Sequence, residues 1–230
     1  FHHHMFAHDT QTVGVLNLGG IANITYLSRT ENSLDGKQGS VVGFDSGPGN
    51  MLLDAWIKQQ LGQDYDANGA WASSGQTIPS LLARLLQEDF FAAPPPKSTG
   101  RDLFNLTWLE ENLQSVASFN PAMAVQDVAH TLVDLSAESV CAALKTHCPA
   151  VDEVYLCGGG AHNHLLVKKL QTLLGPIPCK LTDSLGIGVD WVEAIAFAWL
   201  AKQCLDKKTA NLAAVTGASG ARILGAIYQH

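Results

Sequence analysis

The sequence is poor in charge, and it lacks the features that mark membrane or nucleic-acid partners. Only 15% of its 230 residues are charged, and no basic cluster exceeds the pairs Lys168–Lys169 and Lys207–Lys208. With a formal net charge of −7, the chain has no basic footprint for a nucleic acid. No run of about 18 apolar residues exists, which excludes an ordinary membrane-spanning helix. We therefore expect neither nucleic acid nor a membrane as a partner.

Cysteine pairs with metal-binding spacing are also absent. The five cysteines are scattered, and none stands in a C-x-x-C arrangement. Such cysteines are typical of reduced thiols, so we predict a cytoplasmic protein without a metal site. The tract His2–His4 could be native sequence, a tag remnant or a metal-binding stretch. Apolar residues, in contrast, make up 47% of the chain, which is enough for a globular core.

Apolar periodicity predicts an α/β fold, with a mixed sheet and helices on both of its faces. Three strands close in sequence, at 13–18, 21–27 and 41–45, are expected to be antiparallel neighbours. Loops are expected at 32–40 and, around three consecutive prolines, at 92–100. Further strands are predicted at 151–157 and 177–181, and helices at 49–61, 78–87, 106–113, 121–147, 162–174 and 190–204.

The most informative motif places one carboxylate after a short apolar strand. The strand at 41–45 ends in Asp45, and Gly47, Pro48 and Gly49 follow before apolar positions resume at helical spacing. A strand, a glycine-rich turn and a helix present a reactive side chain at the carboxyl edge of an α/β sheet. From these residues alone, Asp45 is either a site carboxylate or the cap of the following helix.

Two further glycine turns are candidates for nucleotide contacts. Gly19 and Gly20 separate two predicted strands and are flanked by Asn17 and Asn23. The N–H groups of such a turn can point at phosphate oxygens, although an ordinary hairpin also explains the glycines. The run Gly158–Gly160 ends a strand and precedes a helix, which favours close approach of a nucleotide to the backbone. It lacks the third glycine of the dinucleotide fingerprint.

Other local motifs are weaker. Lys97 and Arg101 lie in a hydroxyl-bearing loop that could meet an anion or be solvated. Asp190 is predicted to cap the helix at 190–204. Glu193, in the first turn of that helix, is either a residue that stabilises the helix dipole or a second site carboxylate.

Two motif matches fail on inspection. The segment 64–69 imitates the first half of a calcium loop, but the twelfth position is Gly75, where a bidentate glutamate is required. Ser46 lacks the G-x-S-x-G frame of a serine hydrolase. We therefore reject calcium binding and serine hydrolysis.

The motifs together resemble one known family, and the resemblance extends over the whole chain. The matching segments are 17–25, 43–50, 66–72, 94–101, 157–163, 190–194 and 211–228. The order of these segments and the residues within them resemble those of 1,6-anhydro-N-acetylmuramic acid kinases of bacterial cell-wall recycling. The resemblance implies an actin/hexokinase/Hsp70-like ATPase fold, in which two lobes surround a cleft.

The resemblance also implies a reaction. Such an enzyme adds water across the 1,6-anhydro bond of the sugar and phosphorylates the freed 6-hydroxyl from ATP with Mg²⁺. Asp45 matches the catalytic base. The implied nucleotide contacts are Gly19, Gly20, Asn23, Gly158, Gly159, Gly160 and Asn163. The implied sugar contacts are Glu193, Asn50 and Gly47. A homodimer is the family-level expectation.

The resemblance concerns the C-terminal portion of that family. We expect an N-terminal lobe, with its own phosphate loop and further sugar contacts, to be missing from the chain. Within it, 1–45 is expected to form the strand meander with the phosphate turn, 46–150 the helical sugar-site and flap segment, and 151–230 the adenosine segment. The alternatives are another sugar or acid kinase of the same superfamily and a non-catalytic nucleotide-binding module.

Overall fold

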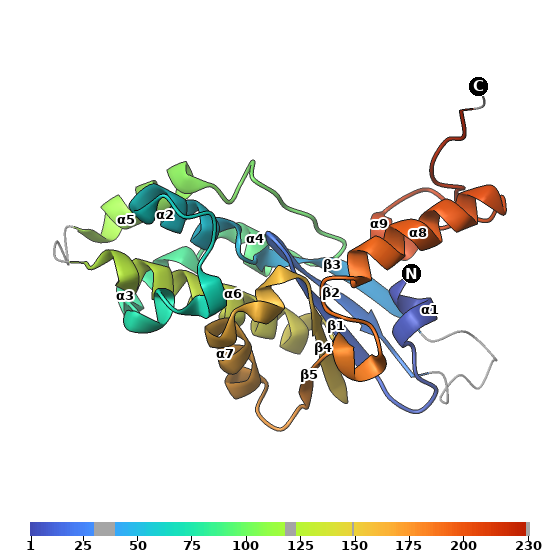
Figure 1. Ribbon diagram of the computed structural model, residues 1–230, viewed down its shortest axis with the longest axis horizontal. Helices are drawn as coiled ribbons and strands as arrows, with labels where there is room; N and C mark the ends of the chain where they lie inside the picture. The colour runs from blue at the N-terminus through green and yellow to red at the C-terminus, as the bar shows by residue number, and fades with distance from the viewer. Residues whose placement is uncertain (30–39, 118–122, 149, 229–230) are drawn as a thin grey trace.

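The computed structural model describes residues 1–29, 40–117, 123–148 and 150–228, and it is built around one five-stranded mixed sheet (Figure 1). The strand order is β3-β2-β1-β4-β5. β1 pairs antiparallel with β2 and parallel with β4, β2 pairs antiparallel with β3, and β4 pairs parallel with β5. The strands are β1 (Val13–Leu18), β2 (Ile21–Leu27), β3 (Val41–Pro48), β4 (Glu153–Cys157) and β5 (Cys179–Leu181).

Helices surround this sheet and fill the long segment between β3 and β4. The α-helices are α1 (His2–Phe6), α2 (Met51–Leu61), α3 (Pro79–Leu85), α4 (Asp89–Ala92), α5 (Leu106–Ala117), α6 (Val125–His147), α7 (His164–Leu174), α8 (Val192–Leu205) and α9 (Ala213–Thr216). The short 3₁₀ helices are η1 (Ala67–Gly69), η2 (Ala72–Ser74), η3 (Gly159–His162) and η4 (Thr182–Leu185). No helix of the described residues is long and apolar enough to span a membrane.

The two faces of the sheet differ in what covers them. Alternate strand residues such as Leu16, Ile24 and Phe44 enter the main core, where α6 and α7 pack on the sheet. The residues between them face the other way: Val13 and Val15 join a smaller cluster that includes residues of α1 and α8. The expectation of a mixed sheet with helices on both faces is confirmed. The smaller cluster covers less of its face of the sheet than the main core covers of the other, so a site can lie on that face.

Local patterns predicted much of this arrangement. The bounds of β1 and β2 agree with the prediction, and α2 ends where Gly62 adopts a left-handed φ of 70°. The segments 1–45 and 151–230 contribute strands to the same sheet. Most of the predicted loop at 32–40 and the predicted helix start at Pro121 lie outside the described residues.

Candidate functional site

A row of polar side chains crosses the middle strands on the less covered face of the sheet. Asn17 of β1 is the cross-strand partner of Asn23 in β2, and Asn23 is the partner of Asp45 in β3. Cys157 of β4 continues the row beside Asn17. Because cross-strand partners point to the same face, the pairing register brings these four side chains together. The pairing of β2 with β3 shifts its register between Ala22 and Asn23.

The loop before α5 holds the Asp45 carboxylate in place. Both the Ser98 hydroxyl and the Thr99 backbone N–H donate to Asp45 Oδ2, each at 2.9 Å. The Asp45 N–H donates to the Lys97 carbonyl at 3.1 Å. Within the described residues Oδ1 receives no hydrogen bond. Asp45 therefore has one oxygen held by this loop and one that receives no contact from the described residues, and it does not cap α2, which begins at Met51. Its role as a site carboxylate stays a prediction.

Lys97 stabilises this loop through contacts of its ammonium group. Its ammonium donates to the carbonyls of Phe90 and Phe91 at 2.9 and 3.2 Å and lies 4.5 Å from the centre of the Phe90 ring. Burial lowers the pKa of Lys97. Arg101 is exposed. The predicted exposed loop at 92–100 is thus tied down next to Asp45.

The Gly19–Gly20 turn packs against the start of α2. Its carbonyl oxygens accept hydrogen bonds from the N–H groups of Gly49, Asn50 and Met51 at 2.8–3.1 Å. A β-carbon at Gly49 would lie 2.2 Å from the Gly19 carbonyl oxygen. The Asn50 amide donates to the Leu18 carbonyl at 3.3 Å. The two glycine-rich turns predicted from the sequence are therefore one interlocked unit.

The three glycines after β4 have different roles. A β-carbon at Gly158 would lie 2.3 Å from Asn17 Oδ1, and one at Gly160 would lie 2.7 Å from Leu18 Cβ. A β-carbon at Gly159 would meet nothing within 4 Å. Gly158 and Gly160 thus allow the turn to approach β1, whereas Gly159 faces open space. The turn continues as the short helix η3, so the glycines do not open α7 directly.

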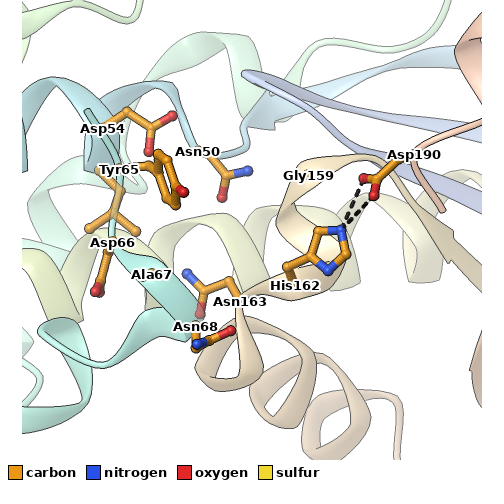
Figure 2. Close-up of a pocket in the computed structure, with 11 residues that line it drawn as sticks. Asn50, Asp54, Tyr65, Asp66, Ala67, Asn68, Gly159, His162, Asn163 and Asp190 are labelled. Atoms are coloured by element: carbon orange, nitrogen blue, oxygen red, sulfur yellow. Dashed lines mark hydrogen bonds and ion pairs between the residues drawn. The ribbon is translucent and has the colours of Figure 1, made fainter. Parts of the chain in front are cut away.

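A pocket of about 610 Å³ borders Gly159 (Figure 2). Figure 2 shows Asp54 and Tyr65 on one wall and the pair His162–Asp190 on the other. Asn50, Asp66, Asn68 and Asn163 also line it. Because α2 and its following segment form one wall and the glycine turn the other, the pocket combines segments far apart in the sequence.

Two of the lining residues are held by structural contacts. The carboxylate of Asp66 accepts the backbone N–H groups of Trp71 and Ala72, both at 2.9 Å. Asn163 Oδ1 accepts the Leu166 N–H at 3.1 Å and so caps α7. These contacts shape the pocket, and Asn163 also borders the space beside Gly159.

The prediction that Asp190 caps the following helix is wrong. The N-cap of α8 is Trp191, and no side chain accepts its first N–H groups. The Asp190 carboxylate instead lies 2.9 and 3.0 Å from His162 Nε2. Folding brings His162, which is 28 residues away in the sequence, next to the Asp190 carboxylate. This long-range contact takes the place of the predicted helix cap.

Glu193 lies in the first turn of α8, as predicted, and lines a second pocket of about 340 Å³. Asn17, Gly158, Gly159 and His2 also line this pocket. Desolvation lowers the pKa of His2 to about 4, so its ring is neutral near pH 7. His2 Nδ1 lies 2.8 Å from Thr25 Oγ1, which shows that the start of the histidine tract is part of the folded structure.

Asp45 lines a third pocket, of about 530 Å³. Asn23, Ser98 and residues of α9 line it as well. Since Asn17 borders the Glu193 pocket and its cross-strand partner Asn23 borders this one, the two pockets lie along the same polar row. Gly47 lines none of the pockets described here; it is buried, with a β-carbon position only 2.6 Å from the Phe91 ring. A sugar contact at Gly47 stays a prediction.

Sequence inspection missed several pocket residues. Asp54, Tyr65 and His162 were not singled out as candidates, although Tyr65 lies in the segment 64–69 and His162 in the family-matching segment 157–163. Neither motif pointed to these particular side chains. Within the described residues no group of three His, Cys, Asp or Glu side chains could hold a metal ion.

Comparison with known proteins shows the family of this chain. A sequence profile of the anhydro-N-acetylmuramic acid kinase family matches residues 1–230. The chain belongs to the anhydro-N-acetylmuramic acid kinase family. A family member from Nitrosomonas europaea is 50% identical over 228 residues, which is 99% of this chain and 59% of the relative. One from Coxiella burnetii is 47% identical over 228 residues, 99% of this chain and 58% of the relative. The chain thus spans less than two thirds of these family members.

A solved structure supports the fold. The activator of the 2-hydroxyisocaproyl-CoA dehydratase from Clostridium difficile with bound ADPNP matches with a TM-score of 0.50 at 15% identity. The match covers 89% of this chain and 65% of the activator. The expected actin-like ATPase fold is confirmed for this member of the anhydro-N-acetylmuramic acid kinase family.

Proposed function

We propose that the full-length gene product hydrolyses the 1,6-anhydro bond of 1,6-anhydro-N-acetylmuramic acid and phosphorylates the 6-oxygen with ATP. The observation that carries this proposal is the Asp45 carboxylate, fixed through Oδ2 beside two glycine turns in a chain of this family. The product is N-acetylmuramic acid 6-phosphate, an intermediate of cell-wall recycling. Cytoplasmic location and a homodimer are part of the proposal.

The proposed reaction needs one general base and groups that offset the negative charge on the phosphates. Oδ1 of Asp45 accepts a proton from the water that attacks the anomeric carbon. The bond from this carbon to the 6-oxygen breaks, the 6-oxygen attacks the γ-phosphorus, and ADP leaves. Mg²⁺ bound with ATP would offset charge on the phosphates and would need only one or two protein carboxylates. Asp45 is the one carboxylate among the described residues that line its pocket.

The remaining site residues divide between the two substrates. Gly19, Gly20 and Asn23 are proposed to lie next to the phosphates, and Gly158, Gly159, Gly160 and Asn163 next to the nucleoside. Gly159 faces open space at the edge of two pockets, which supports this assignment. Glu193, Asn50 and Gly47 are proposed as sugar contacts, and Asn50 also lines the pocket beside Gly159. Glu193 lines the pocket that Asn17 borders, next to the row that contains Asp45, and this supports its role.

The function is tested by a substrate screen on the full-length gene product. We expect ADP release that depends on the anhydro sugar and is accompanied by one sugar phosphate per ADP, detected by mass spectrometry. ADP release with a different sugar or acid alone would favour another kinase of this superfamily. ATP binding without sugar-dependent turnover would favour a non-catalytic module.

Removal of the Ser98 hydroxyl should lower turnover more than substrate affinity. Ser98→Ala deletes one of two donors to Asp45 Oδ2, and a hydrogen bond to a charged group is worth about 1.5–3 kcal/mol. We expect kcat to fall roughly 10- to 100-fold with KM little changed. Ser98→Thr, which keeps the hydroxyl, should restore most of kcat. Ser184→Ala serves as the control, because the Ser184 hydroxyl is exposed and donates to the Leu181 carbonyl. A similar kcat in Ser98→Ala and Ser184→Ala contradicts the assignment.

A further inference from the structure

One carboxylate of the Gly159 pocket has no partner in the fold. Asp54 lies in the first turn of α2, one turn after Asn50, whose carbonyl accepts the Asp54 N–H at 2.8 Å. Its side chain is half-buried in the pocket wall. Within the described residues no hydrogen bond or ion pair reaches its carboxylate. A half-buried acceptor without a donor is favourable only if a ligand or water supplies one.

The other carboxylate on this wall is already occupied. Asp66 uses both of its oxygens for the backbone N–H groups of Trp71 and Ala72. This leaves Asp54, rather than the pair, to receive a ligand. A divalent cation would need more free oxygen ligands than Asp54 alone offers, and the described residues contain no metal-binding cluster.

The lining of the pocket excludes phosphate as its occupant. No lysine or arginine is among its described lining residues, whereas Asp54, Asp66 and Asp190 are. Acidic walls repel phosphate groups and favour donors of hydrogen bonds. The phenol ring of Tyr65, which is 66% exposed, lies beside Asp54 (Figure 2). The pocket therefore suits an uncharged group that carries hydroxyls and has an apolar face.

We propose that Asp54 binds the 2′- and 3′-hydroxyls of the nucleotide ribose in this pocket, an assignment that rests on the proposed ATP-dependent function. A carboxylate at this position accepts both hydroxyls of the diol, as acidic residues do in other nucleotide sites. The nucleoside then lies against Gly159 and between the walls of the pocket. Asp54 is a specificity residue for ribonucleotides and takes no part in the chemical step.

Burial adds a pH dependence to this contact. Desolvation, and secondly the charge of Asp66, raises the pKa of Asp54 to about 6. The other titratable groups that line the pocket are Tyr65 on the same wall and His162 and Asp190 on the opposite one. Because the charged form accepts both hydroxyls and these hydroxyls stabilise it, nucleotide affinity should fall as the pH drops through 6.

The test compares ADP with 2′,3′-dideoxy-ADP by calorimetry on the full-length gene product. Wild-type protein should bind ADP about 10- to 100-fold more tightly than the dideoxy analogue, the range for hydrogen bonds to a charged group. In Asp54→Ala and in the equal-sized Asp54→Asn, ADP affinity should fall, and most of the discrimination should disappear. Asp64→Ala removes a neighbouring carboxylate that is exposed and paired with Lys58 at 2.6 Å, and it should retain the discrimination.

The outcomes separate this assignment from the proposed function. If wild-type protein binds ADP but the Asp54 variants discriminate as strongly as wild type, the assignment is overturned while the kinase proposal stands. If wild-type protein binds no nucleotide, both are overturned. Protonation of the nucleotide itself is the same for every variant. A loss of ADP affinity below pH 6 that occurs in wild type but not in Asp54→Asn therefore supports the assignment. Identical pH profiles would oppose it.

Discussion

Asp45→Asn should abolish both the hydrolysis and the phosphorylation step of the full-length gene product. The substituted amide can still accept hydrogen bonds from Ser98 and Thr99 through its oxygen, so the loop should keep its place. It cannot accept the proton from the attacking water. A general base contributes about 10²- to 10⁴-fold to a rate, and we expect kcat to fall by at least this amount, measured as ADP release and as sugar phosphate formed.

The same experiment distinguishes a catalytic from a structural role. Thermal denaturation of Asp45→Asn should match that of wild type, because the residue is half-buried and its hydrogen-bond donors remain satisfied. The matched control Asp64→Asn changes an exposed carboxylate and should leave turnover unchanged. Near-normal formation of sugar phosphate by Asp45→Asn would remove this residue from the role of base.

Gly49→Ala should disrupt the packing of the β1–β2 turn against the start of α2. Its β-carbon would lie 2.2 Å from the Gly19 carbonyl oxygen and 3.2 Å from the Ala22 nitrogen. Both neighbours are backbone atoms, one in the β1–β2 turn and one near the start of β2, and they cannot rotate away as a side chain can. Overpacking of this kind costs about 1–3 kcal/mol, and the hydrogen bonds from the start of α2 to Gly19 and Gly20 would be strained as well.

The measurement is thermal denaturation together with turnover. We expect the Tm of Gly49→Ala to fall by several degrees and kcat to fall at least tenfold, because the turn and Asn50 move with the start of α2. Gly159→Ala is the control for stability, since its added β-carbon meets no atom within 4 Å. Equal Tm values for wild type and Gly49→Ala would show that the turn yields easily and would contradict the close packing described above.

The parts of the fold that follow from local pattern were predicted well. Strands at 13–18 and 21–27 have the predicted bounds, since turn residues limit each apolar run. Gly62 ends α2 in the left-handed conformation that glycine adopts at low cost. Boundaries were less accurate where no capping signal stands at the end: α5 extends to Ala117 instead of residue 113. The short helix α1 was missed because His2–Phe6 has no helical apolar period.

Candidate site residues could be named where one motif contains them, and they were missed where contacts between distant segments bring them together. Asp45 could be singled out because a strand and a glycine turn stand next to it in the sequence. Asp54 and His162 could not be, since only the packing of α2 opposite the Gly158–Gly160 turn makes them line one pocket. Asp190 was misassigned for the same reason: its partner, His162, is remote in the sequence.

The sequence by itself determined the strands and longer helices, the glycine turns, the candidate Asp45 and the family, because apolar period, turn chemistry and motif residues are properties of neighbouring positions. Only the tertiary structure decided that Asn17, Asn23 and Asp45 form one row, since their alignment depends on strand register. It also decided that backbone donors occupy both oxygens of Asp66, whereas no hydrogen bond from the described residues reaches the Asp54 carboxylate. Whether a carboxylate is occupied depends on donors brought to it by folding, and a linear pattern does not contain that information.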